Sequence, residues 1–185
     1  MQNSIELDPN SPGPYAALLT VARGKGTNAN PVFEDARRKF PTDFSLHLQM
    51  LGNLSERWSG VFGNTLAFAR QRSSEDNTNR LQWLIPAAHL DIAMFETDEG
   101  ISNYLKKKDV RAEIQSAFNA YSSLDANDQH YLEGMHYFAA TFFSMLDKKH
   151  TKKAFKKLKG HYSPDVWAHW ADSDKFFMRA KWWAS

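Results

Sequence analysis

The stretch from residue 41 to residue 60, PTDFSLHLQMLGNLSERWSG, has the spacing of one long amphipathic helix. Because an α-helix has about 3.6 residues per turn, apolar residues that recur every three or four positions share one face. Pro41 is placed to end a preceding helix, Thr42 or Asp43 to cap this one, and Gly60 to end it. We expect the other helices to pack around its stripe, which comprises Phe44, His47, Leu48, Leu51, Leu54, Ser55 and Trp58.

The rest of the chain is also divided into helix-spaced segments. Asn30-Pro31 and Ser163-Pro164 each combine a capping residue with a proline suited to a first helical turn. Residues 110–121 have the clearest amphipathic pattern, and residues 131–146 and 151–159 follow with their own apolar faces. No segment alternates as a strand bounded by hairpin turns. The sequence predicts an all-α fold of stacked antiparallel helical hairpins.

The segment from residue 81 to residue 95 differs from the others because it has no polar face. Helices that are apolar all round are buried. We therefore expect it to be a central helix, with Pro86 either kinking it or lying in its first turn.

The chain contains an internal repeat of its sequence pattern at an offset of 85 positions. This offset aligns Phe33 with Phe118, Leu46 with Tyr131, Met50 with Met135 and Trp58 with Phe143. Such a repeat is typical of an α-solenoid, in which each helix pair buries its apolar face against the next pair. We expect a single helical domain over residues 1–185, with two pseudo-repeat halves at roughly 12–72 and 109–183 joined by the buried helix 81–95.

Composition limits the classes of partner. The 185 residues carry a net charge of +2, from 23 basic and 21 acidic side chains, which requires neither a nucleic-acid nor a membrane partner. Cysteine is absent, which excludes disulfides and thiolate metal sites. The N-terminus lacks the pattern of a secretory signal, and no apolar run is long enough to span a membrane, so a cytoplasmic location is expected.

Short motifs carry a family resemblance. The two helix-pair units resemble tetratricopeptide-type repeats, with Ala36 and Pro41 in matching positions. The chain also resembles a tetratricopeptide-like family of bacterial proteins of unknown function, whose recurrent Arg-Trp-Gly-Gly-Ser run is Arg-Trp-Ser-Gly-Val here. The resemblance implies an all-helical scaffold without catalytic residues. It rests on Arg57-Trp58-Ser59-Gly60, Leu66-Ala67-Phe68-Ala69, Tyr104-Leu105, Trp167 and Trp170.

Catalytic and metal-binding patterns are weak. His130 and His136 lie six apart and so fall on different faces of a helix, and there is no HExxH. Ser163, Asp165 and His169 lie close in sequence without a nucleophile elbow, and a helix-capping role for Ser163 explains them better. We expect no catalytic, cofactor or metal site. The alternative left open is a small enzyme with a central cavity, using His89, Asp91 or His136 as acid and base.

The strongest charge run is KKHTKKAFKKLK, which covers residues 148–159. On a helix its lysines occupy about half of the circumference while the apolar residues face inward. It is either a solvated face or a docking surface for an acidic partner, a phosphate backbone or an anionic lipid. Lysine in place of arginine argues against base-specific recognition. The candidate partner-binding lysines are Lys148, Lys149, Lys152, Lys153, Lys156 and Lys157.

Tryptophans gather near the C-terminus. Trp58 and Trp83 fit a core, whereas Trp167, Trp170, Trp182 and Trp183 fit either an interface or a cap on the end of the helix stack. We include Trp167 and Trp170 among the candidate partner-binding residues.

These patterns favour a non-catalytic helical scaffold that binds another protein. One concrete version, by analogy with helical scaffolds encoded beside secreted toxins, is a bacterial immunity protein that neutralises a toxin. The candidate contact regions are the lysine run and the acidic loop at Glu75-Asp76. A nucleic-acid binder using the lysine face is a weaker alternative.

Overall fold

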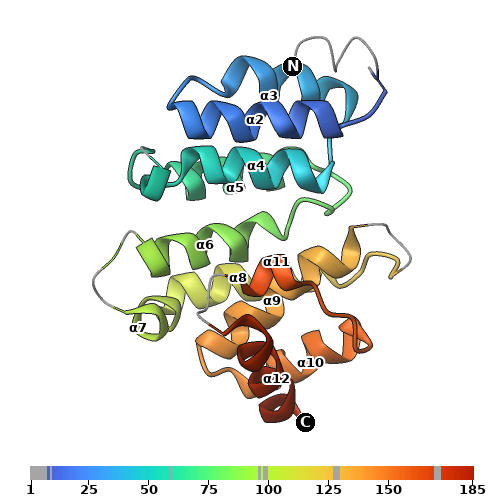
Figure 1. Cartoon of the computed structure of the whole chain (residues 1–185). Helices are drawn as coiled ribbons and strands as arrows, with labels where there is room; N and C mark the ends of the chain where they lie inside the picture. Colours follow the sequence, from blue (N-terminus) through green and yellow to red (C-terminus); the bar gives the residue numbers. More distant parts are fainter. Residues whose placement is uncertain are drawn as a thin grey trace.

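The computed structural model describes residues 8, 10–58, 60–95, 97, 100–126, 130–168 and 172–185, and every regular element among them is a helix. Figure 1 shows the helices stacked in layers, with the N-terminal pair at one end and the C-terminal helices at the other. The predicted all-α fold is confirmed. The elements are α2 (Gly13–Lys25), α3 (Asn30–Lys39), α4 (Phe44–Leu54), the 3-10 turn η1 (Glu56–Trp58), α5 (Asn64–Glu75), α6 (Leu84–Phe95), α7 (Ile101–Leu105), α8 (Lys108–Tyr121), α9 (Tyr131–Ser144), α10 (Lys148–Leu158), α11 (Pro164–Trp167) and α12 (Ser173–Ala184).

The predicted helix 41–60 is shorter than its apolar spacing indicates. Asp43 caps α4 as expected, since its carboxylate accepts a hydrogen bond from the Leu46 backbone N–H at 2.9 Å. The helix ends at Leu54 because Ser55 is extended, and η1 follows as a separate turn. Trp58 is consequently 46% exposed, so the expectation that it lies in the core is wrong.

The core forms two hydrophobic clusters, and α4 contributes to both. Leu46 and Met50 join the smaller cluster, which otherwise belongs to α2, α3 and the turn between them. Phe44 and Leu51 join the larger cluster, which extends from α5 to α12. A single apolar stripe was predicted for α4, but the helix is covered on two sides, and Leu48 and Leu54 are only half-buried.

Helix α6 is buried almost throughout, as its lack of a polar face predicted. Nearly every residue from Leu84 to Ala93 is buried, and Pro86 lies in the first turn. The helix packs against α5 on one side and against α7, α8 and α9 on the others. Trp83, just before it, is 1% exposed and confirms the core position predicted for this tryptophan.

The C-terminal helices largely follow their predicted faces. The whole predicted face of α8 is buried, from Val110 to Tyr121. On α9 the inner residues are buried, but Leu146 lies past the end of the helix with a positive φ of 59° and is 59% exposed. The helix starts predicted at Asn30-Pro31 and Ser163-Pro164 are confirmed as the starts of α3 and α11. Neither Asn30 nor Ser163, however, provides a side-chain cap.

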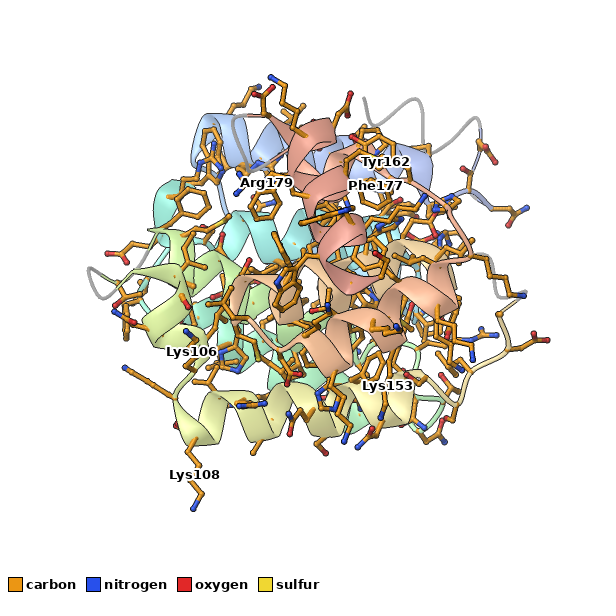
Figure 2. All side chains as sticks on the ribbon, turned by 90° about the horizontal axis from the view of Figure 1, so that it is seen from below. Lys106, Lys108, Lys153, Tyr162, Phe177 and Arg179 are labelled. Atoms are coloured by element: carbon orange, nitrogen blue, oxygen red, sulfur yellow. The ribbon has the colours of Figure 1, made fainter. Side chains whose placement is uncertain are left out.

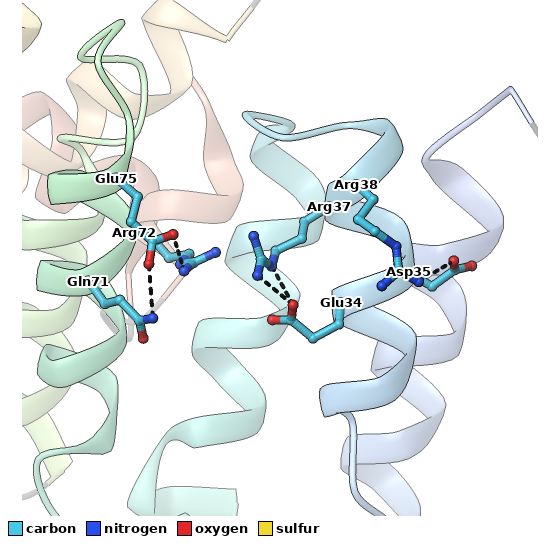
Figure 3. Close-up of polar contacts among 7 residues, drawn as sticks. All are labelled: Glu34, Asp35, Arg37, Arg38, Gln71, Arg72 and Glu75. Atoms are coloured by element: carbon cyan, nitrogen blue, oxygen red, sulfur yellow. Dashed lines mark hydrogen bonds and ion pairs between the residues drawn. The ribbon is translucent and has the colours of Figure 1, made fainter.

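Ion pairs within single helices occur on α3 and α5. Figure 3 shows Glu34 paired with Arg37 and Asp35 paired with Arg38, each one turn apart. On α5, Glu75 accepts from the largely buried Arg72 and from Gln71. Such pairs add a few tenths of a kcal/mol each, about 0.2–0.5, so packing supplies most of the stability.

Alanine substitutions at two helical glycines should change the stability of the protein in different ways. A Cβ on Gly134 would lie 2.2 Å from the Tyr121 hydroxyl and 2.9 Å from the Trp83 Cβ, both in the core. A Cβ on Gly52 would meet only the flexible end of Arg23, at 2.3 Å. We expect Gly134→Ala to lower the free energy of unfolding by about 1–3 kcal/mol through overpacking. Gly52→Ala should leave it unchanged or raise it by up to about 1 kcal/mol through helix propensity. Urea denaturation of both variants checks this, and equal effects would contradict the packing argument.

Candidate functional site

A cleft of about 280 Å³ lies between α4 and α6 and carries several charged groups. Helix α2 contributes Arg23, the turn η1 contributes Arg57 and Trp58, α9 contributes Tyr137 and α11 contributes Asp165. Segments distant in sequence therefore meet at one opening. The remaining lining residues are Leu48, Gln49, Leu51, Gly52, Ser55, Ala87, Leu90, Asp91, Met94 and Phe95.

The backbone after α4 forms a tight turn that holds Arg57 and Trp58 at the cleft. The Ser55 carbonyl accepts hydrogen bonds from the Trp58 N–H at 2.9 Å and from the Gly60 N–H at 3.0 Å. A Cβ at Gly60 would lie only 2.0 Å from the Leu54 carbonyl oxygen, so only glycine allows this close approach.

Two guanidinium groups and two aromatic rings form one end of the cleft. The Cζ of Arg57 lies 5.2 Å from the Trp58 ring centre and 4.7 Å from that of Phe95. The Cζ of Arg23 lies 5.7 Å from the Trp58 ring centre, so Trp58 contacts both cations. Burial, and secondarily the charge of Arg57, lowers the pKa of Arg23 below its ordinary value. These contacts hold cationic groups beside exposed rings.

Two aspartates also line the cleft. Asp91 of α6 and Asp165 of α11 both lie near Tyr137, whose side chain is buried. Burial, followed by the charges of Asp165 and Asp91, raises the pKa of Tyr137 well above its ordinary value. The hydroxyl of Tyr137 is therefore protonated at neutral pH. The cleft thus carries two arginines, from α2 and η1, and two aspartates, from α6 and α11.

Large apolar side chains are exposed around the η1 end. Trp58 and Phe95 are 46% and 39% exposed, and Val61 and Phe62 are each 65% exposed. We call these four residues the η1 patch. Exposed large apolar side chains beside arginine are typical of protein-binding surfaces, where aromatic residues and arginine are enriched.

The predicted lysine face is exposed, but it has no adjoining cleft among those described. All six candidate lysines on α10 are exposed. Lys152 donates to the Ser185 carbonyl at 2.8 Å and Lys157 to the Ser122 carbonyl at 3.2 Å. Figure 2, which views the C-terminal end of the stack, labels Lys153 of α10 and Arg179 of α12. Nothing in these contacts separates a solvated face from a docking surface.

The C-terminal tryptophans divide between core and surface. Trp167 is fully buried, so it is not accessible to a partner, contrary to its inclusion among the binding candidates. Trp170 lies outside the described residues. Trp182 is 79% exposed on α12, beside the exposed Met178. Burial of Trp167 follows from tertiary packing, since it donates its indole N–H to His136 Nδ1 at 3.0 Å.

The acidic loop after α5 is held by its own hydrogen bonds. Asp76 accepts from the backbone N–H groups of Thr78, at 2.9 Å, and of Leu81, at 2.7 Å. Glu75 is paired with Arg72. These carboxylates therefore shape the turn into α6, and a partner would have to compete with the existing bonds.

The histidine and aspartate of the enzyme alternative are not gathered into one site. His89 Nε2 donates to the Glu113 carboxylate at 3.0 Å and its Nδ1 accepts from the Tyr104 hydroxyl at 3.0 Å. Glu113 also binds Arg70, and Arg70 and His89 together lower the pKa of Glu113 to about 2. Of the three candidate residues, only Asp91 lines the cleft.

His136 belongs to a separate buried cluster. Its Nδ1 accepts from Trp167, so its Nε2 carries the proton and donates to His161 Nδ1 at 3.2 Å. His169, the third member of the Ser163 and Asp165 set, lies outside the described residues. Within the described part of the chain, no group of three or more His, Asp or Glu side chains is placed to hold a metal ion.

The sequence contained a partial signal for this cleft. The Arg57-Trp58 pair was noted, but its helical spacing placed Trp58 in the core. The exposed Val61 and Phe62 lie between two glycines and belong to no apolar stripe, which is the pattern that marks them as surface residues. Arg23 could not be connected to this loop from the sequence, because it comes from a helix more than thirty residues earlier.

Comparisons with protein-family models, with curated proteins and with solved structures find no match to this chain. Among the described helices, none is both long and apolar enough to cross a membrane.

Buried neutral histidines predict a pH-dependent stability. Burial lowers the pKa of His47 to about 4, and burial with the neighbouring His161 lowers that of His136 to about 3. The unfolded chain, with pKa values near 6.5, takes up these protons first, so stability falls as the pH decreases below about 6.5. We expect a loss of roughly 2 kcal/mol per histidine between pH 7 and pH 5. Urea denaturation at both values measures it, and His47→Leu should remove about half of the difference.

Ser55 supplies a further prediction. Its side chain is 2% exposed and its hydroxyl has no hydrogen-bond partner among the described residues. Ser55→Ala should therefore leave the free energy of unfolding unchanged or raise it by about 1 kcal/mol. The matched variant is Ser73→Ala, because the buried Ser73 hydroxyl donates to the Leu81 carbonyl at 3.0 Å. That variant should lose about 1 kcal/mol, and a similar loss for Ser55→Ala would show that its hydroxyl is bonded.

Proposed function

We propose that this chain is a non-catalytic helical scaffold that binds another protein through the η1 patch and the adjoining cleft. The single observation that carries the proposal is the exposure of Trp58 and Phe95 in a cleft that also holds two arginines, with the exposed Val61 and Phe62 following Trp58 closely in the chain. Large apolar side chains are costly to leave in water. Tryptophan and arginine also dominate the energetics of protein interfaces.

The helical arrangement supports a tetratricopeptide-like solenoid as the scaffold. Helices α2 and α3 pack together and both contact α4, which packs on α5, and α5 packs on α6. The positions paired by the 85-residue offset are mostly buried in both halves, including Phe33 with Phe118 and Met50 with Met135. A stack of this kind presents continuous outer surfaces for recognition. An immunity protein that covers a toxin is one version of this proposal.

Affinity capture from the native host tests the proposal. We expect the wild-type protein to retain a protein partner and the double variant Trp58→Ala, Phe62→Ala to lose it. The matched control is Trp182→Ala, which removes another exposed tryptophan, 79% exposed, from the opposite end of the stack. Direct binding of the purified partner to each variant then measures the effect, expected to exceed about tenfold in Kd for an interface anchor.

The same variants separate the alternatives. If only Trp182→Ala loses binding, the interface lies at the C-terminal end. If the double variant Lys149→Ala, Lys153→Ala loses binding although its η1 patch is intact, the interface lies on the lysine face. Recovery of no protein partner by the wild type contradicts the scaffold function.

A further inference from the structure

The two arginines of the cleft lack an anionic partner. No hydrogen bond or ion pair joins Arg23 or Arg57 to another residue in the described part of the chain, and their contacts are with aromatic rings. Other arginines of the fold do have such partners, including Arg70 with Glu113 and Arg111 with Asp147. The two cleft arginines therefore differ from Arg70 and Arg111 among the described residues.

This arrangement is electrostatically unfavourable without a bound anion. Arg23 is half-buried, and the nearby Arg57 carries the same charge. Both burial and a like charge disfavour the cationic form. A ligand carboxylate at this point offsets the repulsion and gives the guanidinium groups hydrogen-bond acceptors, which Arg matches in a planar, bidentate geometry.

The unbonded hydroxyl of Ser55 points to a ligand independently. Ser55 lines the same cleft, its side chain is 98% buried, and its hydroxyl finds no partner in the described structure. Buried hydroxyl groups in proteins are nearly always hydrogen-bonded. A polar ligand atom in the cleft can accept this hydrogen bond.

The size and the apolar walls of the cleft define the ligand further. Its volume of about 280 Å³ is slightly below the usual range for drug-sized ligands, so it suits one or two side chains. Leu48, Met94 and Phe95 provide apolar wall next to the cationic end. Asp91 and Asp165 also line the cleft, so an acidic group is favoured only where it lies against the arginines.

We propose that the Arg23 and Arg57 end of the cleft binds a glutamate or aspartate side chain of the partner protein, with an adjacent apolar side chain of the partner packing against Leu48 and Met94. The Ser55 hydroxyl donates to the same acidic group. Trp58 and Phe95 hold the Arg57 guanidinium between their rings and so orient it before binding. This inference rests on the proposed protein-binding function and names the chemistry that the partner must carry.

Synthetic peptides test the inference without the natural partner. The probes are acetylated, amidated heptapeptides with a central leucine or phenylalanine flanked by glutamates, and matched peptides with glutamine or lysine in place of glutamate. Binding is followed by the indole N–H signal of Trp58 in two-dimensional NMR spectra, assigned from its loss in Trp58→Phe. We expect the glutamate peptides to bind and the lysine peptides not to bind.

Variants of the protein assign the binding to the cleft. Arg57→Ala should weaken binding of the glutamate peptides about tenfold or more, as expected when charged hydrogen bonds are lost. Gly52→Ala should also weaken binding of the glutamate peptides, because its Cβ displaces the Arg23 guanidinium. This variant keeps every charge of the cleft. Ser55→Ala should weaken binding without loss of thermal stability. The matched control is Arg179→Ala, since Arg179 is exposed on α12 and forms no ion pair with a described residue.

The outcomes distinguish this inference from the protein-binding function. Equal binding of glutamate and lysine peptides overturns the inference, as does equal weakening by Arg57→Ala and Arg179→Ala. Failure of every glutamate peptide also overturns it. If Trp58→Ala, Phe62→Ala still loses the captured partner in that case, the protein-binding function stands and only the carboxylate recognition falls.

Discussion

The fold depends on α4 being covered on two sides. Leu46 and Met50 pack into the N-terminal cluster, while Phe44 and Leu51 pack into the main core. Buried between them, His47 donates from Nδ1 to the Asp43 carbonyl at 2.8 Å and contacts the Phe33 ring edge-on at 5.2 Å. Because one helix belongs to both clusters, the N-terminal helices cannot separate from α4 without exposing Leu46 and Met50 to water.

The cleft exists because α4 stops early. Had the helix continued to Gly60, Trp58 would have followed the stripe into the core and Arg57 would have pointed elsewhere. The extended Ser55 instead directs the chain into η1, and Gly60 closes the turn. Exposed rings and arginines without an ion pair to a described residue both lower stability, and they occur together at this cleft. Proteins commonly retain such local costs where a surface has to recognise something.

The histidines illustrate how polar groups stabilise an aromatic-rich helical core. His89 joins α6 to α7 and α8 through Tyr104 and Glu113, and Arg70 of α5 extends this network. His136 joins α9 to α11 through Trp167. Each of these two imidazoles is hydrogen-bonded through both of its ring nitrogens. Because these bonds join neighbouring helices, the histidines contribute to helix packing.

The sequence alone determined the helical class, the buried central helix and most inward faces, because these follow from spacing within one segment. Residues 84–93 and the face from Val110 to Tyr121 are examples. It also limited the cap of α4 to Thr42 or Asp43, because a cap is a local hydrogen bond, and Asp43 forms it. Burial of Trp167 and exposure of Trp58 were not determined in this way, since each depends on where distant helices lie. Likewise, only the tertiary structure placed Arg23 beside Arg57, because close packing of α2 across Gly52 of α4 brings together two charges that no sequence pattern connects.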